Sequence, residues 1–309
     1  IEILFGNTKA TVTQDMRYQY EYLEKMAMAW GMKGTSVYHD KKLKRDIMFG
    51  LEWLYQNLYG PDELEDKGWR SIWLFNWWDW AIGVPQSLMK TCAILGDELP
   101  QEKCDKYLNI AKRMIEMKLT YITTGQAGSR MAVVPIIAIL TEDKKLLEKY
   151  AEDYALLFDP RNTLESGDGI IAADDMYLAH YLAYTIGYGV AWLQRQGMLN
   201  PIVKDSALEL ETPFTYDTVK RAITKTFKPT MIYGRAMSML GGRQTYESSE
   251  YGLAIQMLNA LTYYIGIYGE EVDNEVKTFI KSNIDADTLE YASTRLQPNV
   301  VQKLVEIYN

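Results

Sequence analysis

The sequence has few cysteines, few histidines and no long hydrophobic run. Its 309 residues include two cysteines and two histidines, His39 and His180. Two cysteines cannot provide a disulfide framework, and no stretch of about 18 uninterrupted apolar residues, as a membrane-spanning helix requires, is present. Metal-ligand spacing of His, Cys or carboxylate is absent, and so is a Gly-rich phosphate loop. We therefore expect no metal, no nucleotide and no other cofactor.

Positively charged residues are in deficit. The chain has 33 Lys and Arg against 41 Asp and Glu, which gives a net charge of −8. Nucleic acid or an anionic membrane surface would favour a concentrated basic face, so neither is expected as a partner. An anionic ligand is compatible with this charge if positive side chains gather locally.

The two cysteines, Cys92 and Cys104, fall in a segment whose pattern predicts two helices joined by a turn. They could form a disulfide in an oxidising compartment or remain two buried thiols. Because two cysteines make no framework, the sequence favours thiols.

Hydrophobic residues recur at helical spacing through most of the chain. The repeat is clear in two segments, at Ile47, Leu51, Leu54 and Leu58 and again at Leu253, Met257, Ala260 and Tyr264. Turn-forming residues separate segments of roughly 10 to 20 residues, and no alternating strand of convincing length occurs. About ten helices joined by short loops predict an all-α fold of antiparallel neighbours.

Four irregular stretches interrupt these helices and collect the polar chemistry. They are rich in glycine, where the backbone can turn sharply or approach a ligand closely. They cover residues 76–88 (NWWDWAIGVPQSL), 120–130 (TYITTGQAGSR), 167–189 (GDGIIAADDMYLAHYLAYTIGYG) and 233–252 (YGRAMSMLGGRQTYESSEYG).

In order and approximate spacing, the motifs NWWDWAIGVPQSL, TTGQ, DDMYLAHYLAYTIGYG and GGRQTYESSEYG resemble those of polysaccharide lyase family 8. This family includes hyaluronate, chondroitin AC and xanthan lyases, and the resemblance extends from about residue 20 to the end of the chain. It implies an incomplete α/α toroid of antiparallel helix pairs, formed by residues 1–309 as one catalytic domain. It also implies a secreted or periplasmic protein that acts on an anionic polysaccharide. In the family, β-sandwich domains follow the toroid, and we do not expect them within these 309 residues. The resemblance therefore implies either a fragment or a toroid that works with another chain, with such β-sandwich domains as its partner.

The resemblance places four catalytic residues, with departures from the family pattern. Gln126 stands where the family has an asparagine, and His180 matches the family's histidine. Tyr188 matches the second tyrosine of the Tyr-Thr-Gly-Ala-Tyr-Gly segment, one residue closer to the histidine than usual. Arg243 matches the arginine of a Gly-Arg pair, while Glu247 replaces a second arginine.

The reaction implied by the resemblance is β-elimination beside a uronic acid, which removes the C5 proton and expels the oxygen on C4. Gln126 would neutralise the carboxylate and Arg243 would act as an electrostatic clamp, so that both stabilise the developing enolate-like charge. Tyr188 would be general base and acid, assisted by His180.

The tryptophan motif offers a sugar-binding surface. Trp77, Trp78 and Trp80 could form a flat wall for sugar rings, with hydrogen bonding from Asn76, although aromatic clusters on one helix are more often core. We expect the four irregular stretches to meet along one substrate groove. On a helix the neighbouring tryptophans point in different directions, so at least one should reach that groove.

Three further residues complete the expected substrate-binding set, Arg130, Tyr184 and Glu247. A carboxylate at Glu247 would repel an anionic sugar or pair with Arg243, and Arg130 could supply the missing positive charge. The departures favour a differently decorated or less charged uronate polymer over standard hyaluronan or chondroitin.

Two alternative functions remain open from the residues. One is a glycan-binding toroid that keeps the aromatic groove and has lost the elimination chemistry. The other is an α/α-barrel glycoside hydrolase, which needs two opposed carboxylates such as Asp79 and Asp174. Taken singly, His180 is more often a structural histidine, and Asp174 and Asp175 a helix cap and a surface charge.

Overall fold

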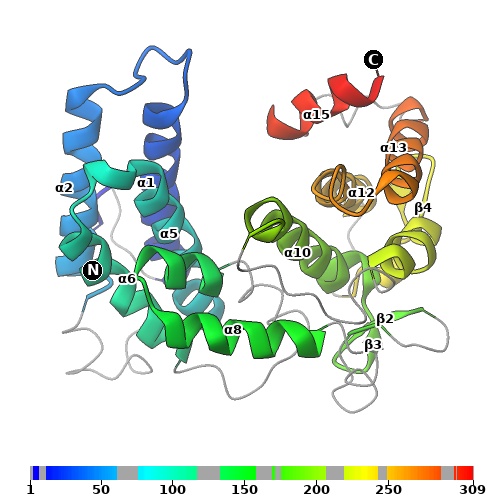
Figure 1. The fold of residues 1–309 in the computed structure, drawn as a ribbon, viewed down its shortest axis with the longest axis horizontal. Coiled ribbons are helices and arrows are strands. Elements are labelled where there is room, and N and C mark those ends of the chain that lie inside the picture. Colours follow the sequence, from blue (N-terminus) through cyan, green and yellow to red (C-terminus); the bar gives the residue numbers. More distant parts are fainter. Residues whose placement is uncertain are drawn as a thin grey trace. The chain divides into compact units, whose positions relative to one another are not determined.

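The computed structural model describes residues 3–6, 12–60, 76–116, 133–157, 169–170, 175–206, 219–242, 249–286, 296 and 298–308. The chain divides into two compact units. The first comprises Ile1–Tyr121 and Val133–Glu148, and the second comprises Ile122–Ala132 and Lys149–Asn309. Helices dominate both units (Figure 1). A single domain over residues 1–309 stays a prediction.

The first unit is built from helices. Its α-helices are α1 (Thr13–Gly31), α2 (Lys41–Asn57), α5 (Val84–Leu95) and α6 (Gln101–Glu116). The π-helix η1 (Asp79–Gly83) precedes α5, and the 3-10 turn η2 (Gly96–Glu98) follows it. Helix α1 packs against both α2 and α5, and α5 packs against α6. Helix α8 (Lys144–Leu157) spans the boundary between the two units in the sequence.

Helix α2 shows how the sequence determines these elements. Asp40 caps its start, because the carboxylate accepts a hydrogen bond of 2.7 Å from the backbone N–H of Leu43. The predicted apolar repeat faces the core, and all four of its residues, Ile47, Leu51, Leu54 and Leu58, are at most 1% exposed. The periodicity therefore predicted both the helix and its buried face correctly.

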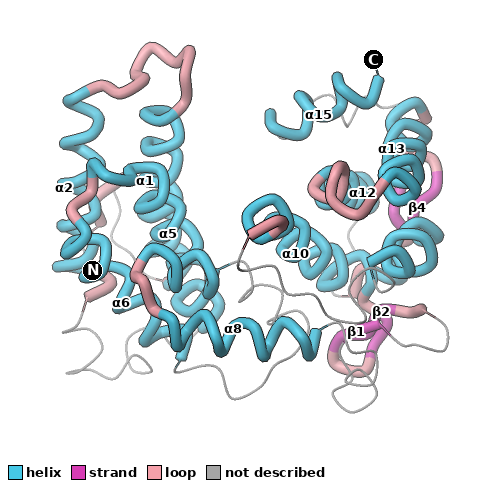
Figure 2. The backbone as a smooth tube through the Cα atoms, viewed as in Figure 1, coloured by secondary structure: helices cyan, strands magenta, loops and turns pink. Residues whose placement is uncertain are grey.

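The second unit adds short strands to its helices. Its helices are α10 (Val190–Val203), α12 (Ser249–Thr262), α13 (Glu270–Asp285) and α15 (Pro298–Tyr308), with the π-helices η3 (Thr185–Gly189) and η4 (Ala222–Phe227) and the 3-10 turns η5 (Lys228–Thr230) and η6 (Ser238–Leu240). Its strands are β1 (Gly169–Ile170), β2 (Tyr177–Ala179), β3 (Leu182–Ala183), β4 (Met231–Ile232) and β5 (Arg235–Ala236) (Figure 2).

Helix α12 forms the centre of this unit, with contacts to α10, α13 and α15. The second predicted repeat is buried on it and just beyond it, with Leu253, Met257, Ala260 and Tyr264 at most 3% exposed. The Tyr264 hydroxyl donates a 2.8 Å hydrogen bond to the backbone oxygen of Leu193 on α10. A buried polar contact therefore fixes the pairing of segments far apart in the sequence.

Two tight hairpins stand out in the second unit. In β2–β3, Ala179 pairs with Leu182, so His180 and Tyr181 form a two-residue turn with φ of 54° and 62°. In β4–β5, Ile232 pairs with Arg235, and Tyr233 and Gly234 form the turn with φ of 51° and 73°. Positive φ at both positions is the type I′ turn, which usually takes Asn-Gly. Strands of two or three residues are too short to produce an alternating sequence pattern.

Cys92 and Cys104 are buried free thiols, the alternative that the sequence favoured. Across the described helices, none is long and apolar enough to cross a membrane.

Candidate functional site

The tryptophan motif begins the helical segment that leads into α5. Asn76 is exposed, and its side-chain oxygen accepts a 3.2 Å hydrogen bond from the backbone N–H of Trp78. The next residues form the π-helix Asp79–Gly83, which continues into α5. Short π-helical segments inside helices frequently mark functional sites, so this geometry agrees with a special role for the motif.

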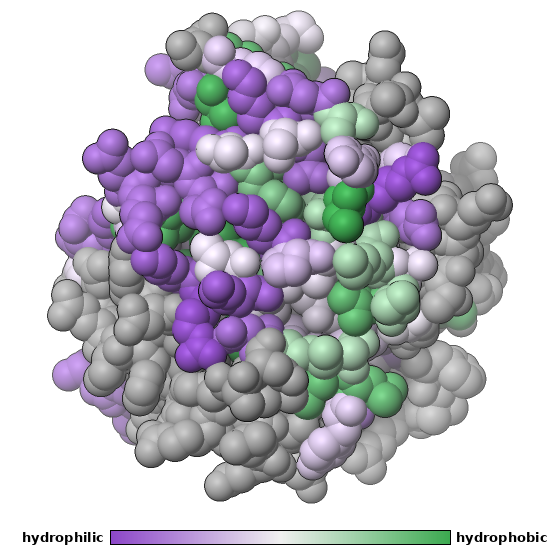
Figure 3. Space-filling view, turned by 90° about the vertical axis from the view of Figure 1, so that its right-hand side faces the viewer, coloured by the Kyte–Doolittle hydropathy of each residue, from purple (hydrophilic) through white to green (hydrophobic). Residues whose placement is uncertain are grey.

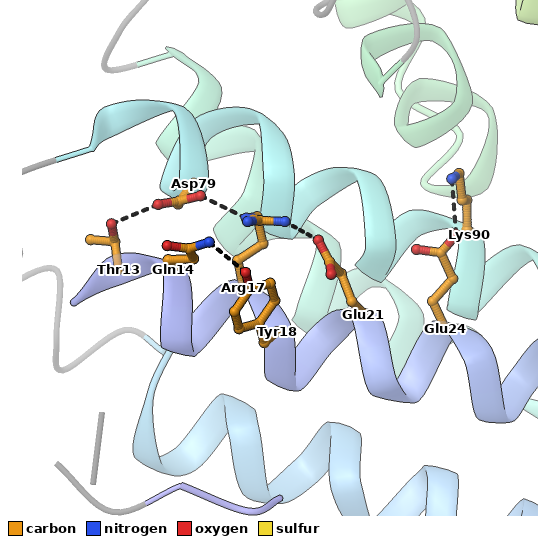
Figure 4. Close-up of polar contacts among 8 residues, drawn as sticks. All are labelled: Thr13, Gln14, Arg17, Tyr18, Glu21, Glu24, Asp79 and Lys90. Carbon is orange, nitrogen blue, oxygen red and sulfur yellow. Dashed lines mark hydrogen bonds and ion pairs between the residues drawn. The ribbon is translucent and has the colours of Figure 1, made fainter. Parts of the chain in front are cut away.

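Asp79 is an internal anchor of the motif. It is 1% exposed and accepts 2.7 Å hydrogen bonds from Arg17 Nε and Thr13 Oγ1, both on α1. Figure 4 shows Arg17 and Asp79 pointing toward one another across the two helices, with Arg17 also paired to Glu21. Both carboxylate oxygens are therefore engaged with α1.

This position opposes Asp79 and Asp174 as an example of the carboxylate pair that the glycoside hydrolase alternative needs. A catalytic carboxylate must reach the scissile bond. Asp79 instead faces the interior and is neutralised by Arg17. Its proposed partner Asp174 lies outside the described residues.

The three tryptophans occupy different environments. Trp80 is 2% exposed, its ring lies 5.7 Å from that of Tyr59, and its backbone oxygen accepts a 2.7 Å hydrogen bond from the Tyr59 hydroxyl. The Trp80 ring is therefore part of the core, and this burial disfavours the predicted substrate contact. Trp77 and Trp78 are half-buried, and for them a sugar-binding role stays a prediction.

Trp78 is held between the same helices. The guanidinium carbon of Arg17 lies 5.7 Å from its ring centroid, within the range of a cation–π interaction. A Cβ atom on Gly83 would lie 2.8 Å from the Trp78 ring and 2.5 Å from Arg17 Cδ. Gly83 therefore lets the arginine and the indole pack together beside the π-helix.

A second cluster, in the other unit, contains the predicted histidine and tyrosine. His180 is exposed on the β2–β3 turn, and Tyr188 is half-buried in η3. Their ring centroids are 6.0 Å apart with an interplanar angle of 69°, an edge-on arrangement. The Tyr184 and Tyr188 rings are 4.6 Å apart. The structure thus brings together two of the four predicted catalytic residues.

Both residues lie on unusual backbone. His180 has φ of 54°, a left-handed conformation that costs a non-glycine residue about 1 to 2 kcal/mol. Tyr188 lies in the π-helix Thr185–Gly189. Such outliers persist where surrounding contacts stabilise them, and they are enriched at active sites.

Tyr184 packs inside this cluster and is only 8% exposed. A Cβ atom on Gly187 or Gly242 would overlap its ring, and Gly242 also has φ of 57°. The ring fills the space between two glycines, which disfavours the predicted substrate contact of Tyr184. Gly242, which packs against this ring, is the residue directly before Arg243 in the sequence.

Four predicted site residues, Gln126, Arg130, Arg243 and Glu247, lie outside the described residues. Asp175 lies within the described residues. Its carboxylate accepts a 2.8 Å hydrogen bond from Arg221 Nε, and the two side chains form an ion pair. In the described part of the chain, no group of three or more His, Cys, Asp or Glu could hold a metal ion.

Sequence reasoning missed Thr13 and Arg17, the residues that hold Asp79. They lie 66 and 62 residues from it, outside every motif considered. An acidic residue within an apolar helical segment is the signal that could have prompted a search for a buried cationic partner.

Comparisons with known proteins agree with the sequence motifs. The family model described as polysaccharide lyase family 8, N terminal alpha-helical domain, matches residues 2–282. A hyaluronate lyase of Enterococcus faecalis is 24% identical over 306 residues, which cover 91% of this chain and 29% of that protein. A xanthan lyase of Bacillus sp. is 29% identical over 245 residues, covering 74% of this chain and 23% of that protein.

Solved structures show the same fold. A Paenibacillus xanthan lyase gives a TM-score of 0.81 at 22% identity, covering 98% of this chain and 28% of that one. A Streptomyces coelicolor chondroitin AC lyase in complex with chondroitin sulphate gives a TM-score of 0.83 at 22% identity. The match covers 96% of this chain and 40% of that one. The predicted fold class, an all-α chain of the incomplete α/α-toroid type, is confirmed. The chain spans less than half the length of each of these proteins.

Proposed function

The chain belongs to polysaccharide lyase family 8, and from this premise we propose that it is the helical catalytic domain of a lyase. The substrate is a polysaccharide that contains uronic acid, and the products include a 4,5-unsaturated uronate end. The pairing of His180 with Tyr188 is the observation that carries the proposal, because it places a proton acceptor beside a group that can polarise it.

The chemistry requires one proton to move between two atoms of the substrate. Tyr188, as phenolate, removes the proton from C5, and the electrons of that C–H bond form the C4–C5 double bond. The C4–O bond breaks, and the Tyr188 hydroxyl returns the proton to the departing oxygen. The overall reaction consumes no water and leaves the tyrosine ready to act again.

Tyr188 needs nearby positive or hydrogen-bonding groups to act as a base, because such groups favour the negatively charged phenolate. His180, whose ring centroid lies 6.0 Å from that of Tyr188, is one such group, and in this proposal it donates a hydrogen bond to the phenolate. In this proposal, Arg243 and Gln126 face the substrate carboxylate and stabilise the enolate-like charge.

The relatives support this substrate class, since they are named as hyaluronate, xanthan and chondroitin AC lyases. A polysaccharide does not cross a membrane unaided, so we propose that the protein acts outside the cytoplasm, as a secreted or periplasmic protein. Trp77 and Trp78 are the aromatic residues that we assign to sugar stacking, since Trp80 is buried.

One assay separates this function from its alternatives. The purified chain is incubated with hyaluronan, chondroitin sulfate and xanthan, and ultraviolet absorbance of unsaturated uronate is followed together with new reducing ends. Elimination produces both signals in equal molar amounts. New reducing ends without absorbance would indicate hydrolysis, and binding without either signal would indicate a glycan-binding protein.

A further inference from the structure

A pocket in the second unit lies outside the predicted catalytic cluster. It has a volume of about 700 Å³ and is formed by the β4–β5 hairpin, Tyr251 of α12 and Ala286 after α13. This volume is within the range of about 300 to 1,000 Å³ that is typical of ligand sites. The face of the molecule on which β4 lies carries a band of hydrophobic side chains next to hydrophilic ones (Figure 3).

The rim of the pocket is rigid. The backbone N–H of Gly234, in the hairpin turn, donates a 3.0 Å hydrogen bond to Oδ1 of Asn283. Asn283 is 5% exposed, and its amide donates in turn to the backbone oxygen of Phe279. A further bond of 2.9 Å joins Met237 N to the Thr230 oxygen. The hairpin is therefore positioned before any ligand arrives, which lowers the entropic cost of binding.

Tyr233 in this turn is difficult to explain by stability alone. Its side chain is 76% exposed, so the ring gains little from burial. Its φ of 51° is one that a bulky residue adopts only with strain, at a position where asparagine is preferred. An exposed aromatic ring held in a strained conformation is available to stack on a ligand.

Arg235 supplies a positive charge next to that ring. It is exposed, and its guanidinium carbon lies 4.9 Å from the centroid of the Tyr251 ring. No carboxylate in the described portion of the chain forms an ion pair with it, although the protein has a net charge of −8. Stacking on Tyr251 orients the planar guanidinium and leaves its N–H groups able to bind a carboxylate in two-point fashion.

We propose that this pocket is a binding subsite for a uronic acid residue of the polysaccharide, separate from the cleavage point. Arg235 binds the sugar carboxylate, and Tyr233 stacks on the apolar face of a sugar ring. This inference rests on the proposed lyase function, because it takes the same polymer as ligand. The hairpin continues into η6, which contacts the η3 segment of Tyr188, so the subsite is linked to the catalytic cluster within one unit.

The test measures binding without turnover. Isothermal titration calorimetry is performed on the Tyr188→Phe protein with oligosaccharides of hyaluronan, chondroitin sulfate and xanthan, and then on the same protein with a second substitution. Arg235→Gln should weaken binding about tenfold. The matched control is Lys281→Gln, which removes an equally positive, exposed side chain from α13 outside the pocket, and it should change binding less than twofold.

Two further measurements separate ligand contact from folding. Tyr233→Asn removes the ring but suits the left-handed turn, so it should weaken binding about fivefold while the melting temperature stays equal or rises. Carboxyl-reduced oligosaccharides should bind the Arg235 protein and its glutamine variant equally.

The proposal is overturned if Arg235→Gln and Lys281→Gln weaken binding equally, if the loss persists with carboxyl-reduced sugars, or if none of the oligosaccharides binds. Failure of the lyase function is a different result. It would appear as absent ultraviolet product from the unsubstituted protein, whatever the effect of Arg235→Gln on binding.

Discussion

Replacing Arg17 with methionine should destabilise the first unit, because it leaves the Asp79 carboxylate in the core without its cation. Removal of one partner from a fully buried ion pair costs about 3 to 5 kcal/mol. Here the Arg17 side chain is 18% exposed and that of Asp79 is 2% exposed, so the pair is mostly buried. Thr13 continues to donate to Asp79, and we therefore expect a loss of about 2 to 3 kcal/mol in the free energy of unfolding.

A matched control is available in a second ion pair that involves α1. Lys90 pairs with Glu24 at 2.9 Å, joining α5 to α1 as Arg17 joins the π-helix to α1, but the Lys90 side chain is 33% exposed. Lys90→Met should cost about 1 kcal/mol or less. Urea unfolding followed by tryptophan fluorescence measures both variants. Equal losses in the free energy of unfolding for Arg17→Met and Lys90→Met would refute the conclusion that burial of Asp79 makes its ion pair contribute more to stability.

Three further predictions concern the cluster around Tyr188 and the contact between α2 and α6. Gly242→Ala should lower the melting temperature of the protein and abolish elimination, because the new methyl group overlaps the buried Tyr184 ring and φ at this position is 57°. The control Gly252→Ala, with open space around the new methyl group, should change neither the melting temperature nor the elimination rate. Tyr188→Phe should reduce the initial rate of ultraviolet-absorbing product by about 10² to 10⁴-fold and leave polymer binding by calorimetry largely intact, and near-normal turnover would mean that another base acts. The hydrogen bond and charge of Lys106 lower the pKa of Glu52 in the folded protein. The ionised Glu52 carboxylate therefore stabilises the fold at pH values above the pKa it has in the unfolded chain. This stabilisation is lost as the pH falls through the lower pKa of the folded state. Glu52→Gln should therefore melt at a lower temperature than the unsubstituted protein at neutral pH, and the difference should disappear in a melting series taken to strongly acidic pH.

The helices could be predicted from sequence because their signal is local and repeated. Four apolar residues in α2 and four around α12 recur at helical spacing, and all are buried as expected. The hairpins could not be predicted in this way, since strands of two or three residues carry no periodicity. Their turns contain His180-Tyr181 and Tyr233-Gly234 in place of the usual Asn-Gly, which removes the strongest hairpin signal.

The candidate site was predictable only in part, for a different reason. The motif resemblance placed His180 and Tyr188, which the structure brings to a ring separation of 6.0 Å. Residue type alone could not show that Trp80 and Tyr184 are buried, because their environments depend on Tyr59 and on Gly242, distant in the sequence. The π-helical geometry at both motifs likewise depends on tertiary contacts and has no simple sequence signature.

The tryptophan motif has a consequence for protein engineering. Within five consecutive residues, Trp77 and Trp78 remain accessible while Asp79 and Trp80 are held in the interior. A mutant library that randomises the whole motif would lose most members to misfolding, because Asp79 is bonded to α1 and Trp80 packs against Tyr59 in the core. A library restricted to positions 76–78 would keep the scaffold intact and vary the surface presented to a glycan. Selection for new polymer preferences should therefore be most productive at these outward positions, since the inward pair Asp79 and Trp80 serves the packing of the fold.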